Sequence, residues 1–385
     1  MRAMAAVFGL LLLAAGGGEP APKPVLVVHG DTTFVDDAYA LSPSGGRLAY
    51  VRSNGADIAQ VEVAELPSGN VEARFSIAAF SRIPERLSFT ENGKLIVVGR
   101  LPDAERREAQ VFDLSGKPLG RKLGPADSIA CAQIDGKSAL VALSIRRSGE
   151  HTSYEVSALR AEDGKALGRR TLSAGRDGLI KLGEGFRIVY WSDDLLHLTG
   201  VKKGEYDKKN DVRRPDRAMI FDVLAGKAVS EHEIGDVVSW VREMRQREQF
   251  PQRAAFVAFS EDLKALELIT ADNRRLEVKT VRPLWKYEPK TILQQAGPEP
   301  GRLYVSLTVD PVNPEAVKKQ KTDPDLFDLY AVDGQSGSAA RVLGGVLAAK
   351  RRLAWVAGGG RVAILRRHQG FDRGGTELEV YDLSR

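Results

Sequence analysis

The chain has 385 residues, of which 43% are hydrophobic and 28% are charged, so it can bury the core of one large or two ordinary domains. Its net charge of +5 permits attraction to anionic partners but does not establish nucleic-acid binding. The single cysteine, Cys131, excludes an internal disulfide, and its apolar surroundings predict a buried structural thiol rather than a catalytic one.

The N-terminus predicts a secretory signal peptide. A basic start at Arg2 is followed by an apolar run over residues 3–15 and by three glycines, so we assign the signal to residues 1–18 and a short leader to residues 19–24. A disordered apolar tail on a cytosolic protein is the alternative. The run is too short to span a bilayer, and no later stretch is long enough. We therefore expect a periplasmic or secreted protein without a membrane segment after signal removal.

From residue 25 onward the chain repeats one motif, which is a short apolar strand, a turn rich in Gly, Asp or Asn, and a returning strand. Residues 111–123 contain the clearest copy, with the turn Asp113-Leu114-Ser115-Gly116. The seven copies lie roughly 45 to 65 residues apart, and a four-stranded propeller blade needs about 40 to 50 residues. Their apolar anchors are Leu66, Leu114, Leu159, Val223, Ile269, Val332 and Leu383.

A hairpin pattern precedes most of these motifs, with a tight turn between two apolar strands, as in residues 40–51 and 87–98. The hairpin supplies strands a and b of a blade, and the later motif supplies strands c and d, which predicts an all-β chain. The fifth repeat permits two assignments. In the first assignment, strand a is residues 237–241, residues 242–249 form one or two helical turns, and strand b is residues 254–259. In the second assignment, residues 254–259 are strand a. We prefer the first, which keeps Ile269 in register.

The segment Ser-Pro-Ser-Gly-Gly-Arg-Leu-Ala-Tyr, residues 42–50, resembles the WD40-like, TolB-type propeller repeat. In that family a Ser-Pro-Asp-Gly turn joins the two inner strands of a blade, and here Ser44 replaces the Asp. The resemblance implies a β-propeller, and it carries over no active-site residue.

The last copy of the motif stops at its turn, so the seventh repeat has strands a, b and c but no strand d. Residues 25–28 form a β-rich apolar run without a hairpin partner nearby. We predict that this run fills the vacant outer position and that the two chain ends thereby close the ring. The prediction is a single seven-bladed β-propeller domain over residues 25–385, and we expect it to be a monomer.

The connections between strands b and c are long and repeatedly basic. Long loops on a rigid scaffold commonly carry binding, so these cations predict a platform for an acidic protein surface, an anionic polysaccharide or a lipid headgroup layer. The alternative is that they are only solvated surface charges. Nucleic acid is excluded as a partner because the chain is exported and few aromatic residues lie among the cations. The candidate binding residues are Arg106, Arg107, Arg146, Arg147, Lys208, Lys209, Arg213, Arg214, Lys318, Lys319, Arg366 and Arg367.

Signals for an enzyme are poor. The five histidines have no metal-ligand spacing, Gly-x-Ser-x-Gly is absent, and the Asp193-Asp194 pair reads as turn capping. We therefore expect no catalytic residue, no metal and no cofactor. The predicted function is an exported cell-envelope scaffold whose basic loop face binds a protein or another anionic polymer. The alternative is a propeller hydrolase or lyase with its site at the central channel.

Overall fold

A computed structural model describes most of the chain between residues 23 and 383. All regular secondary structure in it is β-strand, which confirms the all-β class. The predicted signal peptide (residues 1–18) and the fifth repeat's predicted strand a (237–241) and helical turns (242–249) lie outside the described residues. The described ranges are 23–30, 34–53, 59–77, 83–101, 105–149, 151–174, 179–180, 186–192, 194–235, 256–260, 265–269, 274–278, 287–296, 301–311, 325–348, 354–367 and 376–383.

The first two sheets are four-stranded antiparallel meanders, each built from consecutive strands. Sheet 1 contains β2 (Phe34–Leu41), β3 (Arg47–Ser53), β4 (Ala59–Glu65) and β5 (Val71–Ser76). Sheet 2 contains β6 (Ile83–Phe89), β7 (Leu95–Arg100), β8 (Arg107–Phe112) and β9 (Pro118–Ala126). These strands are the a, b, c and d strands of the first two predicted repeats.

Sheet 3 has nine strands and corrects the predicted number of blades. The third and fourth repeats are not separate, because β13 and β15 both pair with a two-residue strand between them, through Ala174–Ile180 on one side and Ile180–Phe186 on the other. The described strands therefore form six blades rather than seven. Sheet 3 contains β10 (Ser128–Ile134), β11 (Lys137–Ser148), β12 (His151–Arg160), β13 (Ala166–Ala174), β14 (Leu179–Ile180), β15 (Phe186–Trp191), β16 (His197–Lys202), β19 (Asp216–Asp222) and β20 (Lys227–Ile234).

Three further sheets complete the described fold. Sheet 4 contains β21 (Phe256–Phe259), β22 (Leu266–Ile269) and β23 (Arg275–Val278), which match strands b, c and d of the preferred fifth repeat. Sheet 5 contains β24 (Tyr287–Ala296), β25 (Arg302–Pro311), β26 (Asp325–Asp333) and β27 (Ala339–Ala348). Sheet 6 contains β28 (Ala354–Gly358), β29 (Arg361–Arg367), β30 (Thr376–Asp382) and β1 (Leu26–Gly30).

In the recurring turn motif, the aspartate side chain holds the turn by accepting hydrogen bonds. Asp113 Oδ1 accepts hydrogen bonds from the Ser115 hydroxyl (2.6 Å) and from the N–H groups of Ser115 and Lys117 (both 2.9 Å). These bonds hold the pKa of Asp113 below its usual value. Gly116 takes φ +82°, a conformation that other residues avoid. An Asp three residues before a Gly therefore sets the turn between β8 and β9.

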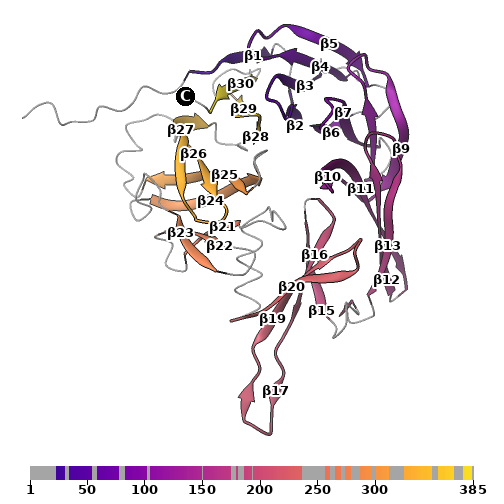
Figure 1. Ribbon diagram of the computed structural model, residues 1–385, viewed down its shortest axis with the longest axis vertical. Helices are drawn as coiled ribbons and strands as arrows, with labels where there is room; N and C mark the ends of the chain where they lie inside the picture. Colours follow the sequence, from indigo (N-terminus) through magenta and orange to yellow (C-terminus); the bar gives the residue numbers. More distant parts are fainter. Residues whose placement is uncertain are drawn as a thin grey trace, which may run out of the picture.

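Buried apolar side chains join neighbouring sheets. The cluster between sheets 1 and 2 includes Val51 and Leu95, and the cluster between sheets 2 and 3 includes Ile96 and Leu140. Among the described residues every neighbouring pair of sheets shares such a cluster except sheets 3 and 4. Figure 1 shows the sheets following one another around a common centre, with β2, β6 and β10 on the inner side and β5, β9 and β13 on the outer side. This arrangement is a β-propeller.

The last sheet packs on the first. In sheet 6, β1 pairs with β30 from Leu26–Val380 to Gly30–Thr376, so the N-terminal strand lies in the outer position. Val28 belongs to a buried cluster that also contains Tyr50 of sheet 1. That this strand is what closes the ring remains a prediction.

Candidate functional site

A projecting hairpin, which we call the arm, connects β16 to β19 on the side of the b–c connections. It comprises residues 203–215 and contains β17 (Tyr206–Asp207) and β18 (Val212–Arg213). Tyr206 pairs with Arg213, and Asp207 pairs with Val212. Figure 1 shows the arm extending away from the body of the propeller. Its strands pair with each other and with no other sheet among the described residues.

The tip of the arm is shaped by Asp207. Its carboxylate accepts hydrogen bonds from the Asn210 side chain (3.0 Å) and from the N–H groups of Lys209 (3.0 Å) and Asn210 (3.3 Å). These contacts lower the pKa of Asp207, with the Asn210 side chain as the largest contributor, so the carboxylate stays ionised near neutral pH. Asp211 closes the turn with φ +54°. The side chains of Lys208 and Lys209 are thereby presented at the exposed end of the hairpin.

The base of the arm is held by a buried carboxylate. Asp216 is 3% exposed, and its Oδ1 accepts a hydrogen bond of 2.6 Å from the Gly204 N–H and one of 3.3 Å from the Arg213 side chain. The Arg214 N–H donates to the Glu205 carbonyl at 3.0 Å. A Cβ at Gly204 would lie 1.7 Å from the Arg214 carbonyl oxygen, so only glycine permits this approach of the two strands.

Four of the predicted binding cations have acidic partners. Arg107 donates to Glu85 (2.7 Å) and to the Asp127 carbonyl (2.7 Å). Arg146 lies 4.0 Å from Glu155. On the arm, Arg213 lies 3.3 Å from Asp216 and Arg214 lies 4.0 Å from Asp207. Neighbouring carboxylates, which are buried or half-buried, thus offset these charges.

Four other predicted cations are exposed, and their side chains have no partner in the part of the chain that the structure describes: Arg106, Arg147, Lys208 and Lys209. Arg106 directly precedes β8, Arg147 is the second-last residue of β11, and the two lysines lie at the tip of the arm. Lys318 and Lys319 lie outside the described residues. Arg366 and Arg367 belong to β29, but their side chains are not described. The twelve residues as one binding face therefore stay a prediction.

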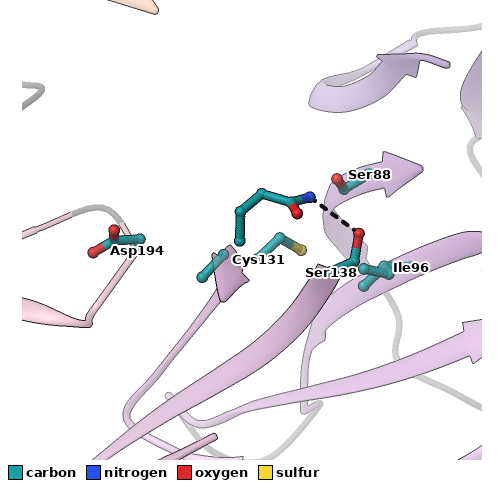
Figure 2. A pocket seen from close by; sticks show the side chains of 7 residues that line it. Ser88, Ile96, Cys131, Ser138 and Asp194 are labelled. Carbon is teal, nitrogen blue, oxygen red and sulfur yellow. Dashed lines mark hydrogen bonds between the residues drawn. The ribbon is translucent and has the colours of Figure 1, made fainter. Parts of the chain in front are cut away.

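A pocket of about 270 Å³ lies on the inner side of sheets 2 and 3 (Figure 2). Sequence reasoning missed it because no local motif unites its lining, which comes from five separate segments of the chain. The Gln133 amide donates a hydrogen bond of 3.1 Å to the Ser138 hydroxyl, which is the dashed line in Figure 2. The lining residues are Ser88, Ile96, Cys131, Ala132, Gln133, Ser138 and Asp194.

The surroundings of the Cys131 thiol in this pocket disfavour its ionisation. Burial raises the pKa of Cys131 to about 11, although the positive charge of Arg86 and a hydrogen bond with Ser88 act in the opposite direction. The thiol is therefore protonated at neutral pH, whereas a nucleophilic cysteine must be a thiolate. Cys131 is half-buried by its exposed surface rather than fully buried as predicted, and the environment of its thiol agrees with a structural rather than a catalytic role.

Asp194 lines the side of the pocket opposite Cys131, and its carboxylate caps the turn between β15 and β16. Its Oδ1 accepts hydrogen bonds from the Ser192 hydroxyl (2.5 Å) and the Leu196 N–H (3.0 Å). Burial opposes ionisation, but these bonds and the His197 ring, whose Nδ1 lies 3.6 Å away, lower the pKa of Asp194. Figure 2 shows its carboxylate pointing away from Cys131. The predicted capping role is confirmed for Asp194, whereas Asp193 lies outside the described residues. Among the described lining residues, none brings a base to the thiol.

The described ranges contain neither a cluster of metal ligands nor a helix that could span a membrane. There, no group of three or more His, Cys, Asp or Glu side chains converges to hold a metal ion. The same residues include no helix with the length and apolar character that crossing a bilayer requires.

Comparison with known proteins gives similarity in fold and no family assignment. No family model and no curated protein matches the chain. Among solved structures, the β-propeller domain of the trilobed protease from Pyrococcus furiosus is 15% identical with a TM-score of 0.42, covering 79% of this chain and 82% of that chain. The polysaccharide lyase Uly1 is 9% identical with a TM-score of 0.45, covering 91% and 90%. The WD40 domain of SCAP from fission yeast is 10% identical with a TM-score of 0.39, covering 94% and 87%.

Proposed function

We propose that this protein is a non-catalytic binding scaffold of the cell envelope, and that cations on its b–c connections hold an acidic partner. One observation carries the proposal: Arg106, Arg147, Lys208 and Lys209 are exposed and lack acidic partners among the described residues. Exposed like charges on one side of a rigid scaffold raise the local concentration of an anionic partner and speed its association.

The test compares two sets of charge reversals with poly-L-glutamate as the acidic probe. Replacing Arg106, Arg147, Lys208 and Lys209 with Glu should weaken binding at least about tenfold and leave the melting temperature unchanged. The matched control reverses four exposed lysines on the a–b and c–d turns, at the opposite ends of the strands. These are Lys117, Lys137, Lys165 and Lys227. Equal weakening by both sets would mean that only net charge acts, and the proposal would be abandoned.

Export is part of the proposal and is supported by the basic start and apolar run of residues 1–18. Removing these residues should leave the protein in the cytoplasm, whereas the full chain should be recovered from the periplasm or medium, with residues 1–18 removed. Cytoplasmic full-length protein would contradict export.

We propose further that β1 closes the ring. Its pairing with β30 and the place of Val28 in the cluster between sheets 6 and 1 support this role. A strand from one chain end that completes the sheet at the other end removes an exposed edge and links the two ends.

An enzyme acting at the inner pocket is the second candidate function. The pocket beside Cys131 favours it because binding sites are concave and carry a few polar groups. Against it stand the raised pKa of the thiol and the orientation of Asp194. A Cys131→Ser variant that abolished a measured hydrolase or lyase activity would replace the scaffold proposal.

A further inference from the structure

The arm carries two exposed apolar side chains on opposite faces. Tyr206 and Val212 keep 56% and 58% of their surface exposed, and the only other exposed large apolar residues among those described, Val71 and Val229, are less exposed at 43% and 46%. Directly paired residues in a two-stranded ribbon point to the same face, and successive residues alternate. Tyr206 therefore shares one face with Arg213, and Val212 shares the other with Asp207.

The charged residues of the arm differ in whether they have acidic partners. Arg213 and Arg214 lie beside Asp216 and Asp207, so the cations along its length are locally balanced. At the tip, Lys208 and Lys209 have no acidic partner among the described residues. The ribbon thus offers apolar contacts on its two sides and the exposed Lys208 and Lys209 at its end. The tip also carries Asp211, whose carboxylate accepts a hydrogen bond from the Tyr206 hydroxyl, and Lys203 is a further exposed cation at the base.

The arm is also prepared to bind without large rearrangement. A short isolated hairpin is marginally stable in water. Here the Gly204 N–H bond to buried Asp216 fixes the base, and Asp207 fixes the tip. Less conformational entropy is therefore lost when a partner engages the arm.

We propose that the arm inserts into a groove of an acidic protein, whose walls contact Tyr206 and Val212 and whose floor carries carboxylates that meet Lys208 and Lys209. This rests on the proposed scaffold function and names its partner class. A flat lipid surface fits the arm less well, since it would contact one face or the tip and leave the other apolar side chain in water. A groove contacts both faces at once, and aromatic side chains with nearby cations are typical of such interface cores.

Photo-crosslinking in the cells that make the protein tests this geometry. p-Benzoylphenylalanine is placed at position 206 or 212, on the two faces, and at position 229 as a control, because Val229 is 46% exposed on β20 of sheet 3, from which the arm projects. Positions 206 and 212 should crosslink to the same protein, and position 229 should not. Adding Lys208→Glu and Lys209→Glu should lower both yields by at least about fivefold without changing the melting temperature.

Several results would overturn the inference. These are adducts from one face only, different proteins at the two faces, equal yield at position 229, or lipid adducts alone. Binding of the full chain to phosphatidylglycerol vesicles, weakened by Tyr206→Ser and by Val212→Ser, would assign the arm to membranes instead. A probe at position 147 separates failure of this inference from failure of the scaffold proposal. Adducts at position 147 without adducts on the arm would rule out insertion of the arm and leave the scaffold proposal standing. Adducts at neither place would rule out both.

Discussion

Arg361 donates a hydrogen bond to the backbone carbonyl of Gly45 at 2.5 Å, across 316 positions of the sequence. Gly45 lies in the a–b turn of the first sheet, and Arg361 begins β29 directly after the a–b turn of the last sheet. A Cβ at Gly45 would lie 2.5 Å from the Gly359 carbonyl oxygen, so the two turns touch through backbone atoms. This contact and the apolar cluster around Tyr50 and Val28 form one seam between the chain's two ends.

Gly45→Ala should destabilise the protein for two reasons, the positive φ of residue 45 and a clash of the added methyl group with the opposing turn. Gly45 has φ +68° and Gly136 has φ +74°, so an alanine at either position has a similar cost of about 1 to 2 kcal/mol. Nothing lies within 4 Å of a Cβ at Gly136, whereas Gly45 meets the opposing turn. Gly45→Ala should therefore cost about 1 to 3 kcal/mol more than Gly136→Ala in denaturant unfolding. Equal losses would show that the seam tolerates an added methyl group.

Val28→Ala should destabilise the whole domain if β1 closes the ring. Val28 is 9% exposed, and losing its methyl groups should cost about 2 kcal/mol. Val71→Ala, at an outer strand position that is 43% exposed, serves as the control and should change stability little. Deleting residues 25–28 should lower the melting temperature further in a single cooperative transition. Unchanged stability after the deletion would contradict closure by β1.

The Cys131 thiol should react slowly at neutral pH. With a pKa of about 11, about one thiol in a thousand is ionised at pH 8, compared with about one in four for an ordinary cysteine. Because the chain has no other cysteine, the rate of reaction with a disulfide reagent reports this group alone. The native rate at pH 8 should be about two orders of magnitude below that of the denatured protein and should rise up to pH 11. A native rate that levels off near pH 8 would revive the catalytic alternative.

Acid should weaken the turns that aspartates cap. Hydrogen bonds from Ser336 and Gln335 lower the pKa of Asp333 in the folded protein. A depressed folded pKa stabilises the fold above the unfolded value near about 4, and this contribution is lost as pH falls through the folded pKa. Asp333→Ala should therefore lower the melting temperature by a few degrees at pH 7 and by less at pH 2.5. Glu105→Ala, at an exposed carboxylate, is the control, and a pH-independent effect of Asp333→Ala would exclude the charge as its origin.

The strands were predictable where local chemistry repeats. Asp113 caps its own turn through near neighbours, so the motif could be read along the sequence, and residues 25–28 were recognisable as a strand without a local partner. The number of blades was not predictable, because it depends on one pairing, Ala174 with Ile180, that joins two repeats into one sheet. No spacing in the sequence encodes such a contact.

The candidate site was predictable only as a set of cations. The sequence could not tell which charges are offset, since Glu85, the partner of Arg107, lies on another strand 22 positions away. The arm is different. Its length and charge were visible, but the opposite placement of Tyr206 and Val212 follows from the register of its two strands. The inner pocket depends on the packing of sheets and had no sequence signal.

The direction of β1 has a mechanical consequence. Its first pair, Leu26–Val380, joins the start of β1 to the end of β30, and its last pair, Gly30–Thr376, joins the end of β1 to the start of β30. A stretching force on the two termini would therefore pull across the strands and open one pair at a time, like a zipper. Resistance to such a force would then depend on a single pair of residues at any moment, so β1 would be released from β30 under a weak pull.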